Sequence, residues 1–282
     1  MSRPADATPA VTAFRELHRS GCFVMPNPWD EGSAIFLAHL GFRALASTSS
    51  GLAFSRGLPD AIGAVPRDMV LTHLRDLVAA TPLPINADFQ DGYARDPEDV
   101  AANVAMCAAT GAAGLSIEDA TGDPAAPLHE PALAIERVRA ARAAIDASGT
   151  GALLTARCEA YLVADPHPAR TALDRLVAYA EAGAECLFAP GVRDPAEIAA
   201  MVKAVAPRPV NVLISAPTAD LSVARATDLG VRRISVGSAL ARVAWGAFMR
   251  AASSLAATGT FDGLAAAAPF GELESLFATR RG

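Results

Sequence analysis

Polar side chains end several apolar runs in this 282-residue chain, and their types point to metal chemistry. Most are hard oxygen ligands, the kind that Mg²⁺ and Mn²⁺ prefer, and no histidine is among them. They are Ser50 after the second run, where Gly51 and Leu52 follow it, Asn86 and Asp88 in the third, Glu118 in the fourth, Arg157 and Glu159 in the fifth, and Asn211 in the seventh. The pattern predicts a divalent-cation site for Mg²⁺ or Mn²⁺.

Three of these residues are the predicted metal ligands. Asn86 and Asp88 are two positions apart on one predicted strand, so both side chains face the same way. Glu118 ends the next strand, where its carboxylate would share the cation with them. The alternative is a strand-end turn in which Asn and Asp cap local backbone groups. Spacing alone leaves both interpretations open.

Anion binding is predicted at two other places. Arg157 ends an apolar strand, and a cation there needs an anionic partner. That partner is either a substrate carboxylate or phosphonate, or the neighbouring Glu159. Ser50, Gly51 and Leu52 supply a hydroxyl and backbone N–H groups that would hold an anion. We take Asn211 as a further candidate substrate-binding residue.

The elements that must position these residues follow a βα pattern. Near-continuous apolar runs predict strands buried on both faces, as in a parallel sheet, at 21–25, 42–48, 84–89, 114–118, 152–157, 186–190, 209–214 and 233–237. Gly41, Gly111, Gly183 and Gly230 each end a helical stretch before a strand, and Asp96-Pro97 and Asp194-Pro195 predict helix starts. Eight βα units predict a single (β/α)₈ TIM-type barrel over 1–282, with a C-terminal helical tail from about residue 240.

Composition narrows the class of partner. The net charge of −6 disfavours nucleic acid. Charged residues or glycines break the apolar runs before the 18 to 20 residues or so that a membrane span needs, so we expect no membrane association. No secretory signal is visible, which predicts a cytoplasmic location. Four scattered cysteines without a C-x-x-C pair form neither a disulfide framework nor a zinc site.

The motifs together resemble the isocitrate lyase/phosphoenolpyruvate mutase superfamily from about Pro26 to about Gly237. Each motif is short, but their order on consecutive strands is specific. They are Ser50-Gly51-Leu52 with Gly57-Leu58-Pro59-Asp60, then Asn86-Ala87-Asp88 with Gly92-Tyr93, then Ser116-Ile117-Glu118-Asp119, then Thr155-Ala156-Arg157-Cys158-Glu159-Ala160.

The resemblance implies a barrel that often exchanges its last helix between subunits, as a homotetramer or dimer, with Mg²⁺ at its mouth and small 2-oxo or 2-hydroxy acids as substrates. By position, Asp88 and Glu118 would hold the metal directly or through water. Asp60 would bind a metal-bound water or face the reacting centre. Arg157 would hold the substrate's anionic end, and the Ser50-Gly51-Leu52 backbone its carboxylate.

At several positions this sequence departs from the family pattern, and these departures limit which of the family's activities the resemblance implies for this chain. Asn86 stands where the family commonly has a metal-binding Asp. The loop at 120–129 lacks the Lys-Lys/Arg-Cys-Gly-His sequence of the isocitrate and methylisocitrate lyases and the mutase's Lys, and Pro190-Gly191 lacks the mutase's His. The proton donor is therefore unassigned, with Tyr93, Tyr161, His129 and metal-bound water as candidates.

Three functions follow as hypotheses. The first is a Mg²⁺-dependent lyase or decarboxylase that cleaves a carbon–carbon bond of a small 2-oxo or 2-hydroxy di- or tricarboxylate through an enolate, with oxaloacetate-like and isocitrate-like acids as leading candidates. The second is carbon–phosphorus chemistry on phosphonopyruvate, which the missing Lys disfavours. The third is a barrel that binds 2-oxo acids without turning them over.

Overall fold

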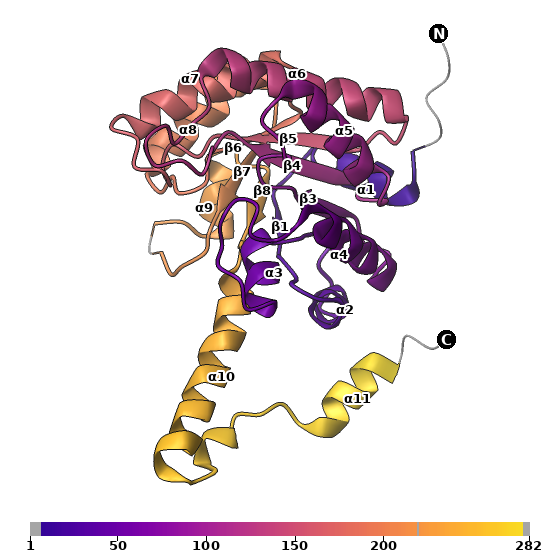
Figure 1. Ribbon diagram of the computed structural model, residues 1–282, viewed down its shortest axis with the longest axis vertical. Helices are drawn as coiled ribbons and strands as arrows, with labels where there is room; N and C mark the ends of the chain where they lie inside the picture. The colour runs from indigo at the N-terminus through magenta and orange to yellow at the C-terminus, as the bar shows by residue number, and fades with distance from the viewer. Residues whose placement is uncertain (1–6, 219, 279–282) are drawn as a thin grey trace.

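Eight short parallel strands form a nearly closed barrel in the structure, a computed structural model that describes residues 7–218 and 220–278 (Figure 1). The strands are β1 (Phe23–Met25), β2 (Leu45–Ala46), β3 (Ile85–Asp88), β4 (Gly114–Glu118), β5 (Leu153–Arg157), β6 (Cys186–Phe188), β7 (Val210–Leu213) and β8 (Arg233–Ser235). They pair in the order β1-β8-β7-β6-β5-β4-β3-β2. All eight predicted strands are present, and the predicted (β/α)₈ fold is confirmed. The predicted 1–282 domain includes residues 1–6, 219 and 279–282, which lie outside the described part.

Helices alternate with the strands. They are α1 (Pro9–Leu17), α2 (Glu31–His39), α3 (Ser49–Ser55), α4 (Arg67–Ala80), α5 (Pro97–Ala108), α6 (Pro131–Ser148), α7 (Pro168–Glu181), α8 (Pro195–Val205), α9 (Val223–Asp228), α10 (Ala239–Thr258), the 3₁₀ helix η1 (Asp262–Leu264) and α11 (Phe270–Ala278). Both predicted Asp-Pro helix starts are confirmed, and Asp194 caps its helix by accepting a hydrogen bond from the Ala196 amide at 2.8 Å. Gly183 has a φ of +107°, a backbone conformation that favours glycine and ends α7 before β6.

The first two strands meet through a side chain as well as through the backbone. The Ala46 amide donates to the Pro26 carbonyl at 3.0 Å. The Asn27 side-chain amide donates to the Ser47 carbonyl at 2.9 Å. Its oxygen accepts from the backbone N–H groups of Val236 and Gly237 at 3.0 and 2.9 Å. Asn27 thereby joins the ends of β1, β2 and β8 and holds the ring together at this seam.

Helix α1 packs against the end of the barrel where the strands begin. Val11 and Phe14 cluster with Phe23 and Met25 of β1 and with Leu153, which begins β5. Since these contacts include the beginnings of strands, the carboxyl ends lie at the opposite mouth. In parallel barrels of this kind, that mouth is where ligands bind.

The C-terminal region leaves the barrel. Helix α10 projects away from the strands, and the chain then turns back so that α11 contacts α2 (Figure 1). Only Ala241 of α10 is buried, whereas Val243, Phe248 and Met249 are about 60% exposed or more. Within the described ranges, no helix combines the length and apolar character needed to cross a membrane.

Candidate active site

Arg157 lies at the centre of a cluster of carboxylates at the barrel mouth. Its Nη1 is 2.7 Å from Asp88 Oδ1, and its Nη2 is 3.1 Å from Glu118 Oε2 and 2.9 Å from Glu159 Oε1. The parallel register explains this, because Glu118 pairs directly with Arg157 across β4 and β5. The Phe188 ring of β6 lies under the guanidinium, 5.2 Å from ring centroid to Cζ, and helps to fix its position. The structure thus brings together Asp88, Glu118 and Arg157, and it shows the predicted alternative partner Glu159 paired with Arg157.

Burial and charge set the protonation of this cluster. Burial raises the pKa of Glu118 well above its ordinary value, and the charge of Arg157 only partly offsets this. Burial also raises the pKa of Glu159. Burial would lower the pKa of Arg157, but the charges of Glu159, Glu118 and Asp88 outweigh that effect and raise it. The cluster therefore holds a permanent cation among acids that resist carrying full negative charge.

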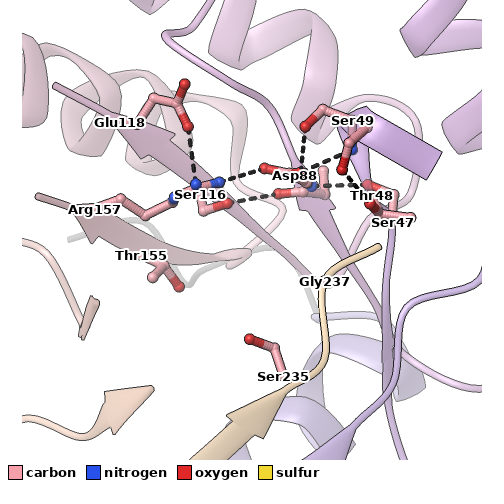
Figure 2. Close-up of polar contacts among 12 residues, drawn as sticks. Ser47, Thr48, Ser49, Asp88, Ser116, Glu118, Thr155, Arg157, Ser235 and Gly237 are labelled. Carbon is pink, nitrogen blue, oxygen red and sulfur yellow. Dashed lines mark hydrogen bonds and ion pairs between the residues drawn. The ribbon is translucent and has the colours of Figure 1, made fainter. Parts of the chain in front are cut away.

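Asp88 is oriented by the start of helix α3. Its Oδ2 accepts hydrogen bonds from the backbone N–H and the hydroxyl of Ser49, both at 2.8 Å, while its own amide donates to Ser47 Oγ at 2.8 Å (Figure 2). Thr48 caps the helix, with its side chain accepting from the Gly51 amide at 3.2 Å. Asp88 is thus fastened on one side by α3 and on the other by Arg157.

The predicted anion-binding segment begins the same helix. The Gly51 amide donates to the Thr48 side chain and the Leu52 amide to the Thr48 carbonyl, and both residues are buried. Of the three predicted residues, Ser50 lines the cavity described next. The role of this segment in holding a carboxylate stays a prediction.

A cavity of about 210 Å³ opens inside the barrel beside the acid cluster. Asp60, on the loop between α3 and α4, lines it together with Asp88 and Arg157. Burial, and then the charge of Asp88, raise the pKa of Asp60. Asn86 also lines the cavity; it is buried, its Nδ2 donates to the Ala87 carbonyl at 3.3 Å, and its Oδ1 has no partner among the described residues. The cavity therefore gathers every predicted metal ligand except Glu118, which lines an adjoining cavity of about 540 Å³.

Inside the barrel, the predicted residue Asn211 contacts Arg233, a buried residue that the sequence analysis did not single out. Asn211 Oδ1 accepts from Arg233 Nε at 2.9 Å, and its Nδ2 donates to Ser235 Oγ at 2.9 Å. Arg233 is 1% exposed and lines the cavity with Asn211 and Ser235. Figure 2 shows Ser235 and Gly237 on the β8 segment, below the acid cluster in that view. The two-residue spacing of Arg233 and Ser235 was the available signal, since it places both on one face of β8.

Asp119 acts behind the site rather than in it. Its Oδ1 accepts from the Glu159 amide at 2.8 Å, and its Oδ2 accepts from the Tyr179 hydroxyl at 2.6 Å and from Arg175 at 3.0 Å. These contacts fix the backbone that carries Glu159. Asp119 is therefore a positioning residue for the acid cluster.

The candidate proton donors do not face either cavity in the part of the chain that the structure describes. The Tyr161 hydroxyl donates to Glu197 at 2.8 Å. The Tyr93 hydroxyl and His129 Nε2 are buried without a hydrogen-bond partner among the described residues. The 120–129 loop instead contributes Gly122, Asp123, Pro124 and Pro127 to the wall of the larger cavity. The structure therefore does not identify the proton donor.

The donor chemistry of the cluster fits a divalent cation. Three carboxylates surround one guanidinium, which leaves an excess of negative charge that burial penalises. Protons or a cation must neutralise that excess, and carboxylate and amide oxygens are the ligands that Mg²⁺ selects. In the described part of the chain, no three His, Cys, Asp or Glu side chains are grouped so that they could hold a metal ion. Arg157 forms ion pairs with both Asp88 and Glu118. The oxygen atoms of Asp88, Glu118 and Asn86 are of the type that Mg²⁺ binds.

The family-model match covers most of the chain. Residues 14–256 match the model described as phosphoenolpyruvate phosphomutase, so the chain belongs to that family. A protein of Mycobacterium tuberculosis with no assigned activity is 33% identical over 266 residues, which cover 93% of this chain and 95% of that one. The predicted family resemblance is confirmed.

Solved and curated relatives extend this picture. A Burkholderia cenocepacia J2315 structure, described only in general terms as a lyase/mutase, is 46% identical, with a TM-score of 0.90 and 95% coverage of each chain. The 2-methylisocitrate lyase of Salmonella typhimurium is 37% identical over 161 residues, or 55% of this chain and 53% of that one. A phosphonopyruvate hydrolase solved with oxalate and Mg²⁺ shares the fold, with a TM-score of 0.84, 24% identity and coverage of 97% of this chain and 96% of that one.

Proposed function

We propose that the protein is a divalent-cation-dependent lyase that cleaves a carbon–carbon bond next to the carbonyl or hydroxyl of a small 2-oxo or 2-hydroxy di- or tricarboxylate. The observation that carries the proposal is Arg157, held among Asp88, Glu118 and Glu159 beside the internal cavity. The family match, the similarity to a 2-methylisocitrate lyase, and the fold shared with a hydrolase that binds oxalate and Mg²⁺ support it.

Asp88, Glu118 and Asn86 would hold the cation, with Asp60 acting through water. A bound Mg²⁺ or Mn²⁺ would supply a Lewis acid that polarises the substrate's carbonyl or hydroxyl oxygen. Asn86 brings no charge, so it would contribute an oxygen ligand without further neutralisation. Its buried Oδ1, which lacks a partner among the described residues, is available for that contact.

Arg157 would orient the substrate's anionic end. Its surrounding acids and the Phe188 ring restrict its movement, so little conformational freedom is lost when substrate binds. The charge that develops as the bond breaks and an enolate forms would lie within reach of this fixed cation, which stabilises it without reorganisation. The 120–129 loop carries neither Lys nor Cys, and decarboxylation depends least on it because solvent can protonate an enolate. Oxaloacetate-like acids are therefore the first substrates to test.

The test is a thermal-shift screen of 2-oxo, 2-hydroxy and phosphono acids with and without Mg²⁺, followed by mass spectrometry of each stabilising mixture. We expect metal-dependent stabilisation and a carbon–carbon cleavage product. Release of phosphate or phosphoenolpyruvate would establish carbon–phosphorus chemistry instead. Stabilisation without product would establish a binding protein.

We also propose that the C-terminal helical region docks against a second copy of the chain. The apolar side chains on α10 form an exposed surface that a monomer leaves in water: Val243, Trp245, Phe248 and Met249. Light scattering should give a dimer or tetramer mass, and Phe248→Asp should lower that mass. An unchanged wild-type monomer mass across the micromolar range would contradict this proposal.

A further inference from the structure

Gln90 has a buried side-chain oxygen that lacks a hydrogen-bond partner. The residue comes just after β3 and is 6% exposed. Its backbone carbonyl accepts from the Glu118 amide at 2.9 Å, whereas its Oε1 has no partner among the described residues. A buried polar atom costs free energy unless another group satisfies it. Gln90 therefore needs a hydrogen-bond donor that the part of the chain described by the structure does not supply.

The backbone at Gln90 is also strained. Its φ is +42°, in the left-handed region that residues other than glycine rarely adopt. Ala164, in the loop after β5, has a φ of +57°. Both residues line the larger cavity of about 540 Å³. Such conformations are concentrated at sites that bind ligands, so the strain marks this cavity as a binding site and not a packing defect.

The wall of the larger cavity suits a neutral group. Among the described residues that line it, the cation is Arg157, which already contacts three carboxylates. Asp123, from the 120–129 loop, adds a negative charge. A further carboxylate would therefore find no unpaired cation among these residues, and burying it would be costly. Apolar side chains form much of the remaining wall: Ala61, Ile62, Pro124, Pro127, Leu162 and Val163.

We propose that the larger cavity holds a neutral, hydroxyl-bearing arm of the substrate and that Gln90 accepts a hydrogen bond from its hydroxyl group. The inference rests on the proposed function, in which the acid group of the same substrate binds beside Arg157. The torsion that orients a glutamine amide is soft, so Oε1 can turn toward a donor in the cavity. Within the proposed class, Gln90 selects acids whose arm carries a hydroxyl group over acids whose arm carries a further carboxylate.

Three 2-hydroxy acids of one chain length test this preference by calorimetric Kd measurement in Mg²⁺. They differ only at the end remote from the acid group: 2,4-dihydroxybutyrate has a hydroxyl there, 2-hydroxypentanoate a methyl and 2-hydroxyglutarate a carboxylate. A second series, 2,5-dihydroxypentanoate, 2-hydroxyhexanoate and 2-hydroxyadipate, has an arm one carbon longer. None has a carbonyl that could stabilise an enolate, so binding is measured without turnover. In at least one series, we expect the wild type to bind the hydroxyl acid about 5- to 20-fold more tightly than the methyl acid, and the carboxylate acid no better than the methyl acid.

Two variants at Gln90 and a matched control locate the preference. Gln90→Gly removes the amide and relieves the strain, so it should abolish the preference and raise the melting temperature. Ala164→Gly relieves strain at the same cavity without removing a polar group, so it should raise the melting temperature and keep the preference. Gln90→Asn keeps an amide on a residue that tolerates the left-handed region, and it should keep part of the preference.

The outcomes separate this inference from the proposed function. Equal binding of the hydroxyl and methyl acids by the wild type overturns the inference alone, and so does tighter binding of the carboxylate acid. A preference that survives in Gln90→Gly, or that Ala164→Gly also loses, overturns it because the Gln90 amide would not be its cause. If the wild type binds oxaloacetate but none of the 2-hydroxy acids, the inference fails and the proposed function stands. Failure to bind oxaloacetate as well overturns both.

Discussion

Two buried arginines of the same barrel have opposite electrostatic environments. Arg157, at the end of β5, contacts three carboxylates, whereas Arg233, at the start of β8, contacts only neutral groups. The acids around Arg157 exceed its charge, so that end of the cavity favours a cation. Arg233 forms no ion pair with an acid among the described residues, so neighbouring carboxylates do not compensate its charge. The difference shows that two arginines buried in one barrel can have opposite electrostatic surroundings, which their residue type alone does not indicate.

The largest effect should come from Arg157→Met. Removing this cation leaves Asp88, Glu118 and Glu159 buried together, and we expect a loss of about 3–5 kcal/mol in the free energy of unfolding at pH 8. Because the pKa values of Glu118 and Glu159 are already raised, the loss should be smaller at pH 5, where protons neutralise them. Urea unfolding at both pH values measures it.

The control for that variant is Arg139→Met. Arg139 pairs with Glu136 on the surface, with more than half of each side chain exposed, and such pairs contribute little. Equal losses in the two variants would show that Arg157 is no more important to the acid cluster than a surface charge.

The next effect concerns the neutral partner of Arg233. The folded pKa of His18 is about 3, below the ordinary value of 6.5, so unfolded chains take up a proton between these values that folded chains exclude. The stability that His18 contributes is present above pH 6.5 and lost as pH falls toward 3, by about 2 kcal/mol at pH 5. His18→Gln keeps an acceptor for Arg233 but cannot titrate. Its unfolding free energy should therefore fall about 2 kcal/mol less than that of the wild type between pH 8 and pH 5.

A smaller effect, and a gain, is expected from Asn211→Asp. The new carboxylate would lie where Asn211 Oδ1 now accepts from Arg233 at 2.9 Å, and Ser235 can rotate its hydroxyl to donate to it. Giving Arg233 an acid should make it resemble Arg157 and raise the unfolding free energy by about 1 kcal/mol at pH 7. A loss of stability would indicate that Arg233 is already compensated.

The smallest effect on stability should come from Arg233→Met. Replacing an uncompensated buried charge by an apolar side chain of similar length removes a cost as well as three hydrogen bonds, so we expect a change within about 1 kcal/mol. Urea unfolding beside Arg157→Met gives the direct comparison. A loss as large as that of Arg157→Met would show that Arg233 is primarily structural.

The sequence predicted the strand ends well because a parallel barrel leaves little freedom there. Apolar runs located all eight strands, and Asp88, Glu118 and Arg157 came together because their strands are neighbours. The sequence indicated Glu159 as a candidate partner of Arg157, whereas its pairing with Asp88 and Glu118 depended on register between strands, which a single sequence does not specify. Arg233 was missed for a related reason: Arg232 and Arg233 are adjacent, and a three-residue strand has no alternation long enough to show which of them faces inward.

The seam at Asn27 has a consequence for how the chain is made. Its side-chain oxygen accepts from Gly237, 210 residues later, and β8 is the strand that β1 pairs with in the described sheet. At the 5–20 residues per second or so of synthesis, β1 spends about 10 to 40 s on the ribosome before its partner exists. An unpaired strand edge is a template for aggregation, but β1 is only three residues long, which gives a neighbouring chain little to pair with. The shortness of the first strand thus protects the nascent chain until the ring can close.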